Sequence, residues 1–229
     1  MLPIDCAGWA LQLLPGGAIY LPEVATLLVA DAHFGKAVSF RLAGVPVPQG
    51  TTTETLQRLT DALAETTATR VIFLGDFLHS AKAHAAPTQQ AIASWRRLHP
   101  ELALTLVRGN HDDRAGDPPA ALGVRVVDEP LLLEKTSSDP LTLPLALCHH
   151  PQRVAGAYVL AGHLHPCVVL TGAGRDRLRL PCFWLGDAVS NPVGVLPAFG
   201  SFTGMHPIER QPRDRVFAIA GASVQQVPA

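Results

Sequence analysis

The stretch Val71-Ile72-Phe73-Leu74-Gly75-Asp76 decides the fold, because four apolar residues run directly into a turn residue and an acid. A short apolar run of this kind is typical of a strand buried on both faces, as in a parallel sheet covered by helices. Before it, Leu27 to Ala30 runs into Asp31-Ala32-His33. After it, Leu102 to Val107 runs into Arg108-Gly109-Asn110-His111-Asp112. We therefore predict three buried strands, each ending in polar residues.

Helices are predicted between these strands. Apolar residues recur at helical spacing over residues 51–66 and 87–98. The later half carries further predicted strands, at residues 141–148, 158–161, 167–170, 178–185 and 216–220. This order predicts one α/β domain over residues 1–229, with a βαβ-like first half and a more antiparallel second half.

The composition excludes several classes of protein. The chain has 229 residues, of which 48% are apolar, so it can bury a continuous core and is not disordered as a whole. No apolar run is long enough to span a membrane. The formal net charge of -1 gives no sign of an extensive basic surface for nucleic acid. Four cysteines without paired spacing, and a first basic residue at Lys36, predict reduced thiols and a cytoplasmic location.

Two later strands also end in polar residues, His149-His150 and Gly162-His163-Leu164-His165. Ligands of open α/β sheets bind beyond the carboxyl ends of the strands, so all five strand ends are expected to converge on one crevice. In an extended strand end, the side chains of residues two positions apart point to the same side. Asp31 and His33 can therefore bind one ion together. The glycines before Asp76, Asn110 and His163 are expected to let the backbone turn sharply beside this crowded centre.

This donor set predicts a metal centre. Imidazole, carboxylate and amide oxygen suit Mn, Fe or Zn, and the lack of thiolate spacing disfavours a structural zinc site. Seven candidate ligands exceed the needs of one ion, so we expect two ions that share one bridging carboxylate.

Five short motifs resemble, in the same order along the chain, the five-motif signature of the calcineurin-like binuclear metallophosphoesterases. They are Asp31-x-His33, Gly75-Asp76, Gly109-Asn110-His111-Asp112, His149 and Gly162-His163-x-His165. Three longer stretches resemble the bacterial branch of ligase-associated DNA-damage-response endonucleases: Asp31-Ala-His-Phe-Gly-Lys36, Gly75-Asp-Phe-Leu-His-Ser80 and Leu196-Pro-Ala-Phe-Gly200. The resemblance implies a four-layer αββα sandwich, with mixed sheets flanked by helices.

The resemblance also implies a ligand set. The first ion would be held by Asp31, His33, Asp76 and His165. The second would be held by Asp76, Asn110, His149 and His163, with Asp76 bridging. The pattern His-x-Pro assigns His149 rather than His150, and manganese is the metal this family commonly uses.

Catalytic and phosphate-binding residues are expected beside these ligands. A dimetal-activated hydroxide would attack phosphorus in line. His111 would protonate the leaving oxygen or bond a phosphate oxygen, and Asp112 would fix its tautomer. Lys36, Arg41 and His79 would grip substrate phosphates, whereas Arg108 would do the same or tie loops together.

The expected activity is cleavage of single-stranded DNA by an endonuclease in repair, in functional association with a DNA ligase and a helicase. The first alternative is a small-molecule phosphodiesterase or a UDP-2,3-diacylglucosamine-type pyrophosphohydrolase. The expected short polar loop after Asp112 offers no apolar cap for acyl chains, which counts against the lipid enzyme. A metal-bound scaffold without catalysis is the second alternative, disfavoured because His111 and both carboxylates are intact.

Overall fold

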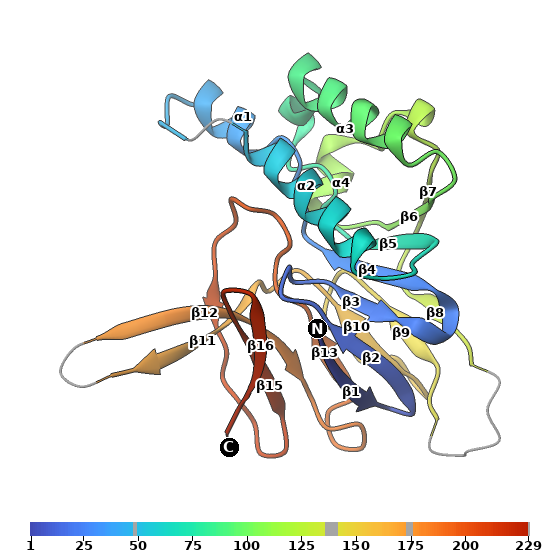
Figure 1. Ribbon diagram of the computed structural model, residues 1–229, viewed down its shortest axis with the longest axis vertical. Helices are drawn as coiled ribbons and strands as arrows, with labels where there is room; N and C mark the ends of the chain where they lie inside the picture. The colour runs from blue at the N-terminus through green and yellow to red at the C-terminus, as the bar shows by residue number, and fades with distance from the viewer. Residues whose placement is uncertain (48–49, 136–141, 173–175, 229) are drawn as a thin grey trace.

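Two β-sheets pack against each other, and helices cover the outer face of the first sheet (Figure 1). The computed structural model describes residues 1–47, 50–135, 142–172 and 176–228. The predicted strand residue Leu141 lies outside the described residues. In the described part of the chain, no helix is long and apolar enough to cross a bilayer.

The first sheet follows chain order. Its strands are β1 (Leu2–Cys6), β2 (Trp9–Leu13), β3 (Ile19–Leu21), β4 (Thr26–Ala30), β5 (Arg70–Leu74), β6 (Ala103–Val107) and β7 (Val124–Val127). Strands β4 to β7 are parallel, so the carboxyl ends of β4, β5 and β6 lie at one edge.

The second sheet is also mixed. In spatial order it contains β14 (His206–Pro207), β11 (Pro166–Thr171), β12 (Arg177–Leu185), β13 (Val193–Val195), β10 (Tyr158–Ala161), β9 (Leu145–Leu147) and β8 (Leu131–Leu133), with β15 (Arg215–Ala220) beside β12 and β16 (Ser223–Val227) beside β15. Strand β10 is parallel to both β9 and β13, so the carboxyl ends of β9 and β10 are adjacent.

Helices come from the first part of the chain. They are α1 (Lys36–Leu42), α2 (Thr51–Ala64), α3 (Ala86–Leu98) and α4 (Asn110–Ala115), with 3-10 turns η1 (Pro22–Val24), η2 (Ala81–His84) and η3 (Ala120–Leu122). Among the described residues beyond Leu122 there are strands and loops only, so the helical layer lies on the first sheet (Figure 1). The predicted mixed sheets flanked by helices are confirmed, but the described residues place helices on one outer face and not on both, as a four-layer αββα sandwich requires.

Alternation along the buried strands explains the layers. In β4, Leu27 and Val29 pack toward the helices, whereas Leu28 and Ala30 pack toward the second sheet. Every residue of β4 is buried, as the continuous apolar run predicts. The three parallel strands predicted at the start of the chain are therefore confirmed.

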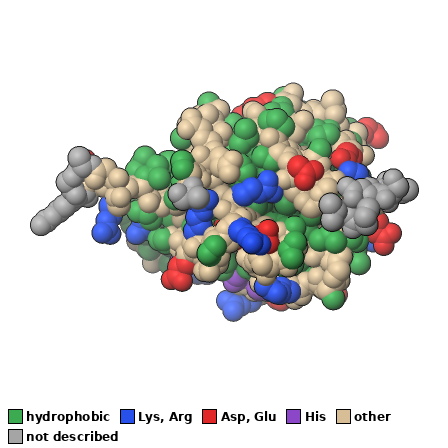
Figure 2. Space-filling view, turned by 90° about the horizontal axis from the view of Figure 1, so that it is seen from below, with side chains coloured by type: hydrophobic (Ala, Val, Ile, Leu, Met, Phe, Trp, Pro, Cys, Tyr) green, Lys and Arg blue, Asp and Glu red, His purple; other side chains and the backbone are tan. Residues whose placement is uncertain are grey.

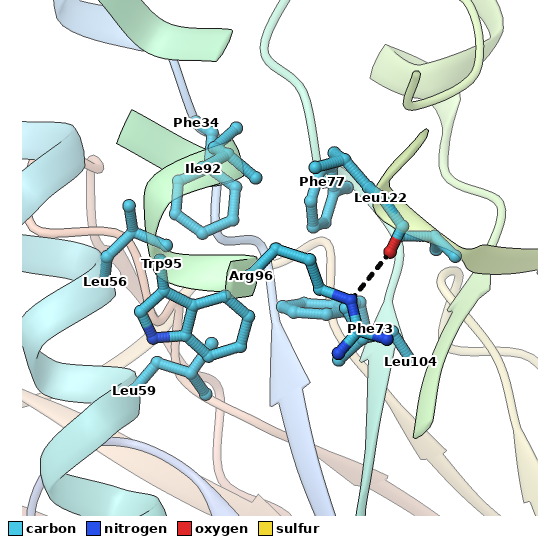
Figure 3. Close-up of a pocket in the computed structure, with 11 residues that line it drawn as sticks. Phe34, Leu56, Leu59, Phe73, Phe77, Ile92, Trp95, Arg96, Leu104 and Leu122 are labelled. Carbon is cyan, nitrogen blue, oxygen red and sulfur yellow. Dashed lines mark hydrogen bonds between the residues drawn. The ribbon is translucent and has the colours of Figure 1, made fainter. Parts of the chain in front are cut away.

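The helical layer is closely packed (Figure 3). Trp95 of α3, Leu59 of α2 and Phe73 of β5 surround a cavity of only about 10 Å³. On its rim, Arg96 Nε donates to the carbonyl of Leu122 at 2.9 Å. A space of this size holds about one water, so it is part of the core and no ligand site.

Two helices were not predicted from the sequence. Residues 36–42 form α1, although the sequence offers no side-chain cap for its first turn. Helix α4 extends through Ala115 into the expected polar loop after Asp112. It forms because the carboxylate of Asp112 accepts the backbone N–H of Gly109 at 3.0 Å and so caps the helix from within its first turn.

Candidate metal centre

The candidate ligands meet where strands of both sheets end. Asp31, Asp76 and Asn110 follow β4, β5 and β6 of the first sheet, while His149 and His163 follow β9 and β10 of the second. Ligand atoms of Asp31, Asp76 and His149 lie within 4.8 Å of one another, and all three residues are buried. The predicted convergence is therefore present in the structure.

Asp76 stands between two groups of imidazoles. Its Oδ1 lies 3.5 Å from His149 Nε2, and its Oδ2 lies 3.7 Å from His33 Nε2. The backbone N–H of His111 donates to Oδ1 at 2.9 Å and fixes the carboxylate plane. Each carboxylate oxygen thus faces a different group, which is the arrangement a bridging ligand needs.

Asp31 presents one oxygen that has no hydrogen-bond partner. Its Oδ2 accepts the backbone N–H of His163 at 2.8 Å. Its Oδ1 is buried and has no hydrogen-bond donor among the described residues, and the nearest imidazole atom, His165 Nε2, lies at 3.5 Å. Buried carboxylate oxygens are normally satisfied, so this oxygen fits a cation held together with His165.

A second group of candidate ligands, formed by Asn110, His149 and His163, places atoms with lone pairs close together. His149 Nδ1 is 3.1 Å from the carbonyl of Leu74 and donates its proton there, which leaves a lone pair on Nε2. That lone pair faces Asn110 Oδ1 at 2.9 Å and His163 Nδ1 at 3.0 Å. The amide oxygen of Asn110 cannot donate to His149, so the two acceptors would repel each other unless a cation lies between them. These residues fit a second metal ion.

Two of the candidate imidazole ligands, His33 and His163, have lowered pKa values, which favours the uncharged ring that metal binding requires. Burial, reinforced by the nearby Lys36 ammonium and His165 ring, lowers the pKa of His33 far below its ordinary value. Burial and the neighbouring His149 ring likewise lower the pKa of His163.

The ligand backbone is not the extended strand end that we expected. Asp31 and His33 have φ angles of 54° and 47°, and His163 and His165 have 72° and 49°. Asp76 shares this left-handed conformation, with a φ of 52°. Non-glycine residues adopt it at a cost, and such outliers cluster at functional sites. The shared facing of Asp31 and His33 therefore comes from two left-handed turns and not from strand alternation.

The three glycines also act differently from the expectation. Only Gly75 has a positive φ, 77°. A Cβ at Gly109 would lie 2.5 Å from Asp76 Oδ1, and one at Gly162 would lie 2.6 Å from Asp31 Oδ2. Their main requirement is close approach of the backbone to the ligand carboxylates.

The environments of His149 and His150 differ, although ligand atoms of both lie within 4.8 Å of each other and of His163. His149 is fully buried in the centre. The His150 side chain is 44% exposed, and its Nδ1 lies 2.8 Å from Glu129 Oε1. The other oxygen of Glu129 accepts the backbone N–H groups of both histidines, at 2.7 and 2.9 Å. The geometry thus favours His149 as the ligand and identifies Glu129 as the residue that positions it.

Glu129 was not found from the sequence. It lies twenty positions before His149 on a segment with no motif of its own, and only the fold brings the two together. Its acidic side chain beside Pro130 gave no signal that a sequence pattern can use.

We expect Glu129→Ala to weaken metal binding by about 10- to 100-fold, because the turn carrying His149 loses three hydrogen bonds. Activity should return at higher Mn²⁺ concentration, as titration of turnover against metal would show. Glu101→Ala, an exposed acid before β6, is the matched control. Unchanged metal affinity in Glu129→Ala would contradict the positioning role.

His111 is oriented by a backbone carbonyl and not by Asp112. His111 Nδ1 lies 2.7 Å from the carbonyl of His79 and donates to it, so Nε2 points toward the centre, 4.0 Å from Asp76 Oδ2. The His79 and His111 rings stack with centroids 4.8 Å apart. The predicted placement of His111 beside the ligands is present.

The expected role of Asp112 is wrong. Its carboxylate accepts the backbone N–H groups of Leu78, at 3.1 Å, and Gly109, and makes no hydrogen bond to His111. Burial raises the pKa of Asp112 to about 6, although these two donors act in the opposite direction. Asp112 therefore holds the loops that carry Asp76 and Asn110.

The predicted phosphate-binding residues divide into two groups. Lys36 is partly buried beside the centre, where burial lowers its pKa and the carboxylates of Asp31 and Asp76 raise it. His79 is also adjacent, with a pKa that burial and Lys36 lower to about 4, so it acts as a neutral hydrogen-bonding ring. Arg41 is exposed near the end of α1.

Arg108 is paired with acidic side chains and not with the candidate metal ligands. Its guanidinium lies 2.6 Å from Asp117 Oδ1, 3.7 Å from Asp128 Oδ1 and 4.0 Å from Asp113 Oδ1. This acidic cluster occupies it, so the alternative role, tying loops together, fits Arg108 better than phosphate binding.

Comparisons with known proteins were made for the whole chain, and a close relative is found among solved structures. No family model and no curated protein matches the chain. Among solved structures, nuclease MPE of Pseudomonas putida is 44% identical and superposes with a TM-score of 0.82, over 99% of both chains. Two further matches are distant: AQ665 of Aquifex aeolicus (18% identity, TM-score 0.42, 61% of this chain and 78% of that one) and the phosphoesterase Yfce of E. coli (11%, 0.43, 88% and 97%).

The first match and the site agree with each other. It extends over the whole described fold, and the five strand-end motifs form one donor set between the two sheets. The chain therefore belongs to the family of the Pseudomonas putida nuclease MPE and is an enzyme of the calcineurin-like binuclear metallophosphoesterases.

Proposed function

We propose that this enzyme is an endonuclease that hydrolyses phosphodiester bonds of single-stranded DNA during repair, with two Mn²⁺ ions and alongside a DNA ligase and a helicase. The observation that carries the proposal is that each carboxylate oxygen of Asp76 faces a different group of candidate metal ligands, one that includes His33 and one that includes His149. The nuclease activity named for the relative, 44% identical over 99% of the chain, supports a nucleic acid substrate.

The residues present fit two ions. Asp31, His33 and His165 would hold the first with Asp76, and Asn110, His149 and His163 would hold the second with Asp76. When bound, two divalent ions supply a positive field that attracts a phosphodiester and activates water for in-line attack.

The chain itself supplies the proton and the grip on the phosphate. With Nδ1 bonded to the His79 carbonyl, His111 can donate a proton from Nε2 to the leaving oxygen. The ammonium of Lys36 is adjacent to both carboxylates and can pair with a non-bridging phosphate oxygen. The neutral ring of His79 can donate a hydrogen bond beside it.

Charge favours a short contact with a single strand over a long duplex groove. The net charge is -1, and Lys and Arg side chains stand in small separate groups on the face seen in Figure 2, among apolar and neutral side chains. A few phosphates bound near the ions would then provide most of the electrostatic attraction.

The structure gives the lipid pyrophosphohydrolase no support. The segment after Asp112 contains the end of α4, the short turn η3 and β7, and none of these is an amphipathic helix that could cover acyl chains. A small-molecule phosphodiesterase remains the rival that the experiment must exclude.

One assay tests the proposal. Mn²⁺-loaded protein is incubated with circular single-stranded DNA, bis-p-nitrophenyl phosphate and the UDP-linked lipid, and the DNA reaction is repeated with Fe²⁺ and Zn²⁺. Nicking of the circle, fastest with Mn²⁺, is expected. Turnover of the small diester without nicking would overturn the assignment of DNA as the substrate. No turnover of any of the substrates would overturn the proposal that the protein is an active enzyme.

A further inference from the structure

A second cavity is lined in part by residues that neighbour the candidate ligands in the chain. It has a volume of about 290 Å³ and is lined by Pro151, Gln152, Arg153, Leu164, Trp184, Asn191, Val193 and Val195. We name it the Trp184 pocket. Leu164 lies between the candidate ligands His163 and His165, and Pro151 directly follows His149-His150. Its wall is thus part of the two segments that carry three candidate ligands.

Trp184 is held rigidly in this pocket. It lies on β12 between β13 and β15, and its indole Nε1 donates to Asp214 Oδ2 at 2.7 Å. Asp214 is buried and also accepts the backbone N–H of Gln211 at 2.8 Å. The ring of Trp184 is partly exposed and makes no aromatic or cation–π contact within residues 1–47, 50–135, 142–172 and 176–228. The cavity is therefore lined by a partly exposed indole whose nitrogen is held by a hydrogen bond.

The remaining walls suit a planar polar ligand. Val193, Val195 and Leu164 are apolar, whereas Gln152 and Asn191 offer amide donors and acceptors at the edges. The one charged residue in the lining is Arg153, a cation, so nothing in it repels a phosphate-bearing molecule. Arg153 donates to the carbonyl of Ser190 and so is fixed at the rim.

We infer that the Trp184 pocket binds the nucleobase next to the scissile phosphodiester by stacking it on the indole. This inference rests on the proposed nuclease function. Stacking on aromatic rings accepts any base, because every base has a π face, and it is the usual way in which single strands are held. Amides at the rim then contact the base edge while the adjacent phosphate reaches the ions.

The competing apolar groove fits a base less well. It lies beside His79 and is lined in part by Phe40. Phe40 already packs edge-on against Phe202, with centroids 5.6 Å apart, so its ring is used in packing.

Intrinsic fluorescence tests base binding without turnover. Trp184 is the partly exposed tryptophan, whereas Trp9 and Trp95 are 0% and 7% exposed. Titrating Mn²⁺-loaded protein with dAMP should quench the emission, and deoxyribose 5-phosphate, which lacks the base, should not. Trp184→Phe should abolish the quenching. Quenching that persists in Trp184→Phe, or none in the native protein, would overturn the inference.

Kinetics provide the second test. Trp184→Ala should raise KM for single-stranded DNA by about tenfold with kcat little changed, while Trp184→Phe keeps most of the affinity. Leu178→Ala, an exposed apolar residue on the same strand, is the matched control. If DNA is cleaved and KM does not change, the pocket assignment fails and the proposed function stands. If native protein leaves DNA uncut, both fail.

Discussion

Replacing Asp76 with asparagine is expected to lower phosphodiester turnover by on the order of a thousandfold or more, since several kcal/mol of transition-state stabilisation depend on the ions. The two oxygens of Asp76 face His33 and His149 separately, and an amide nitrogen at either position cannot bind a cation. Metal content measured after dialysis should fall below two ions per chain, and kcat on bis-p-nitrophenyl phosphate should fall with it.

The stability of the metal-free protein separates this effect from misfolding. Ligand oxygens of Asp31 and Asp76 lie within 4.8 Å of each other and are buried, so the metal-free centre holds two carboxylates whose negative charges repel each other. Asp76→Asn removes one of them and should not lower the metal-free Tm. Asp61→Asn, on the exposed side of α2, is the control. Native turnover in Asp76→Asn would exclude the bridging role.

Replacing His111 with alanine is expected to lower kcat on DNA by about 10²- to 10⁴-fold, the usual contribution of a general acid. Its Nε2 points into the centre because Nδ1 is bonded to the His79 carbonyl. Both ions should remain bound. The loss should be much smaller on bis-p-nitrophenyl phosphate, because nitrophenolate leaves without needing a proton.

Comparing the two substrates defines the role of His111. Equal losses on both would mean that His111 bonds a non-bridging phosphate oxygen and does not protonate the leaving group. Loss of metal would place His111 among the ligands. His99→Ala is the matched control, since His99 packs on Trp95 at the end of α3, just before β6 begins at the edge opposite the centre.

The sequence predicted where the centre forms. Continuous apolar runs such as Val71 to Leu74 indicate strands buried on both faces, and their carboxyl ends must share one edge once the strands are parallel. The family resemblance added the division of ligands between two ions. Strand ends and the order of the motifs can be read from neighbouring residues, so the amino-acid sequence alone was enough to predict them.

The backbone at those ligands could not be predicted. The left-handed φ of Asp31, His33 and Asp76 is unfavourable in isolation and is imposed by contacts from other strands, such as the His33 N–H that donates to the Asp76 carbonyl. The same limit applies to Asp112. Its nearness in sequence to His111 suggested a partnership, but the first turn of α4 directs its carboxylate to Gly109 and Leu78 instead.

Residues that act from a distance were also outside the reach of the sequence. Glu129 lies in a loop, belongs to no motif and contacts His149 and His150 only through the fold. Trp184 falls in a predicted strand, but its place in the lining of a cavity with Pro151 and Leu164 depends on contacts between distant segments. Arg108 shows the converse: its position beside a motif suggested phosphate binding, whereas three acids surround it in the fold.

The donor set includes residues of both sheets, so bound ions would link the two layers directly. Asp31, Asp76 and Asn110 come from one layer, and His149 and His163 from the other. A chelator would thus remove more than reactivity, because the two layers would then be joined at that edge only by apolar contacts and by hydrogen bonds such as His163 N–H to Asp31 and His149 to the Leu74 carbonyl. Neither half could assemble the cage by itself, so a protein cut between them would recover its chemistry only after the pieces had closed around the cations.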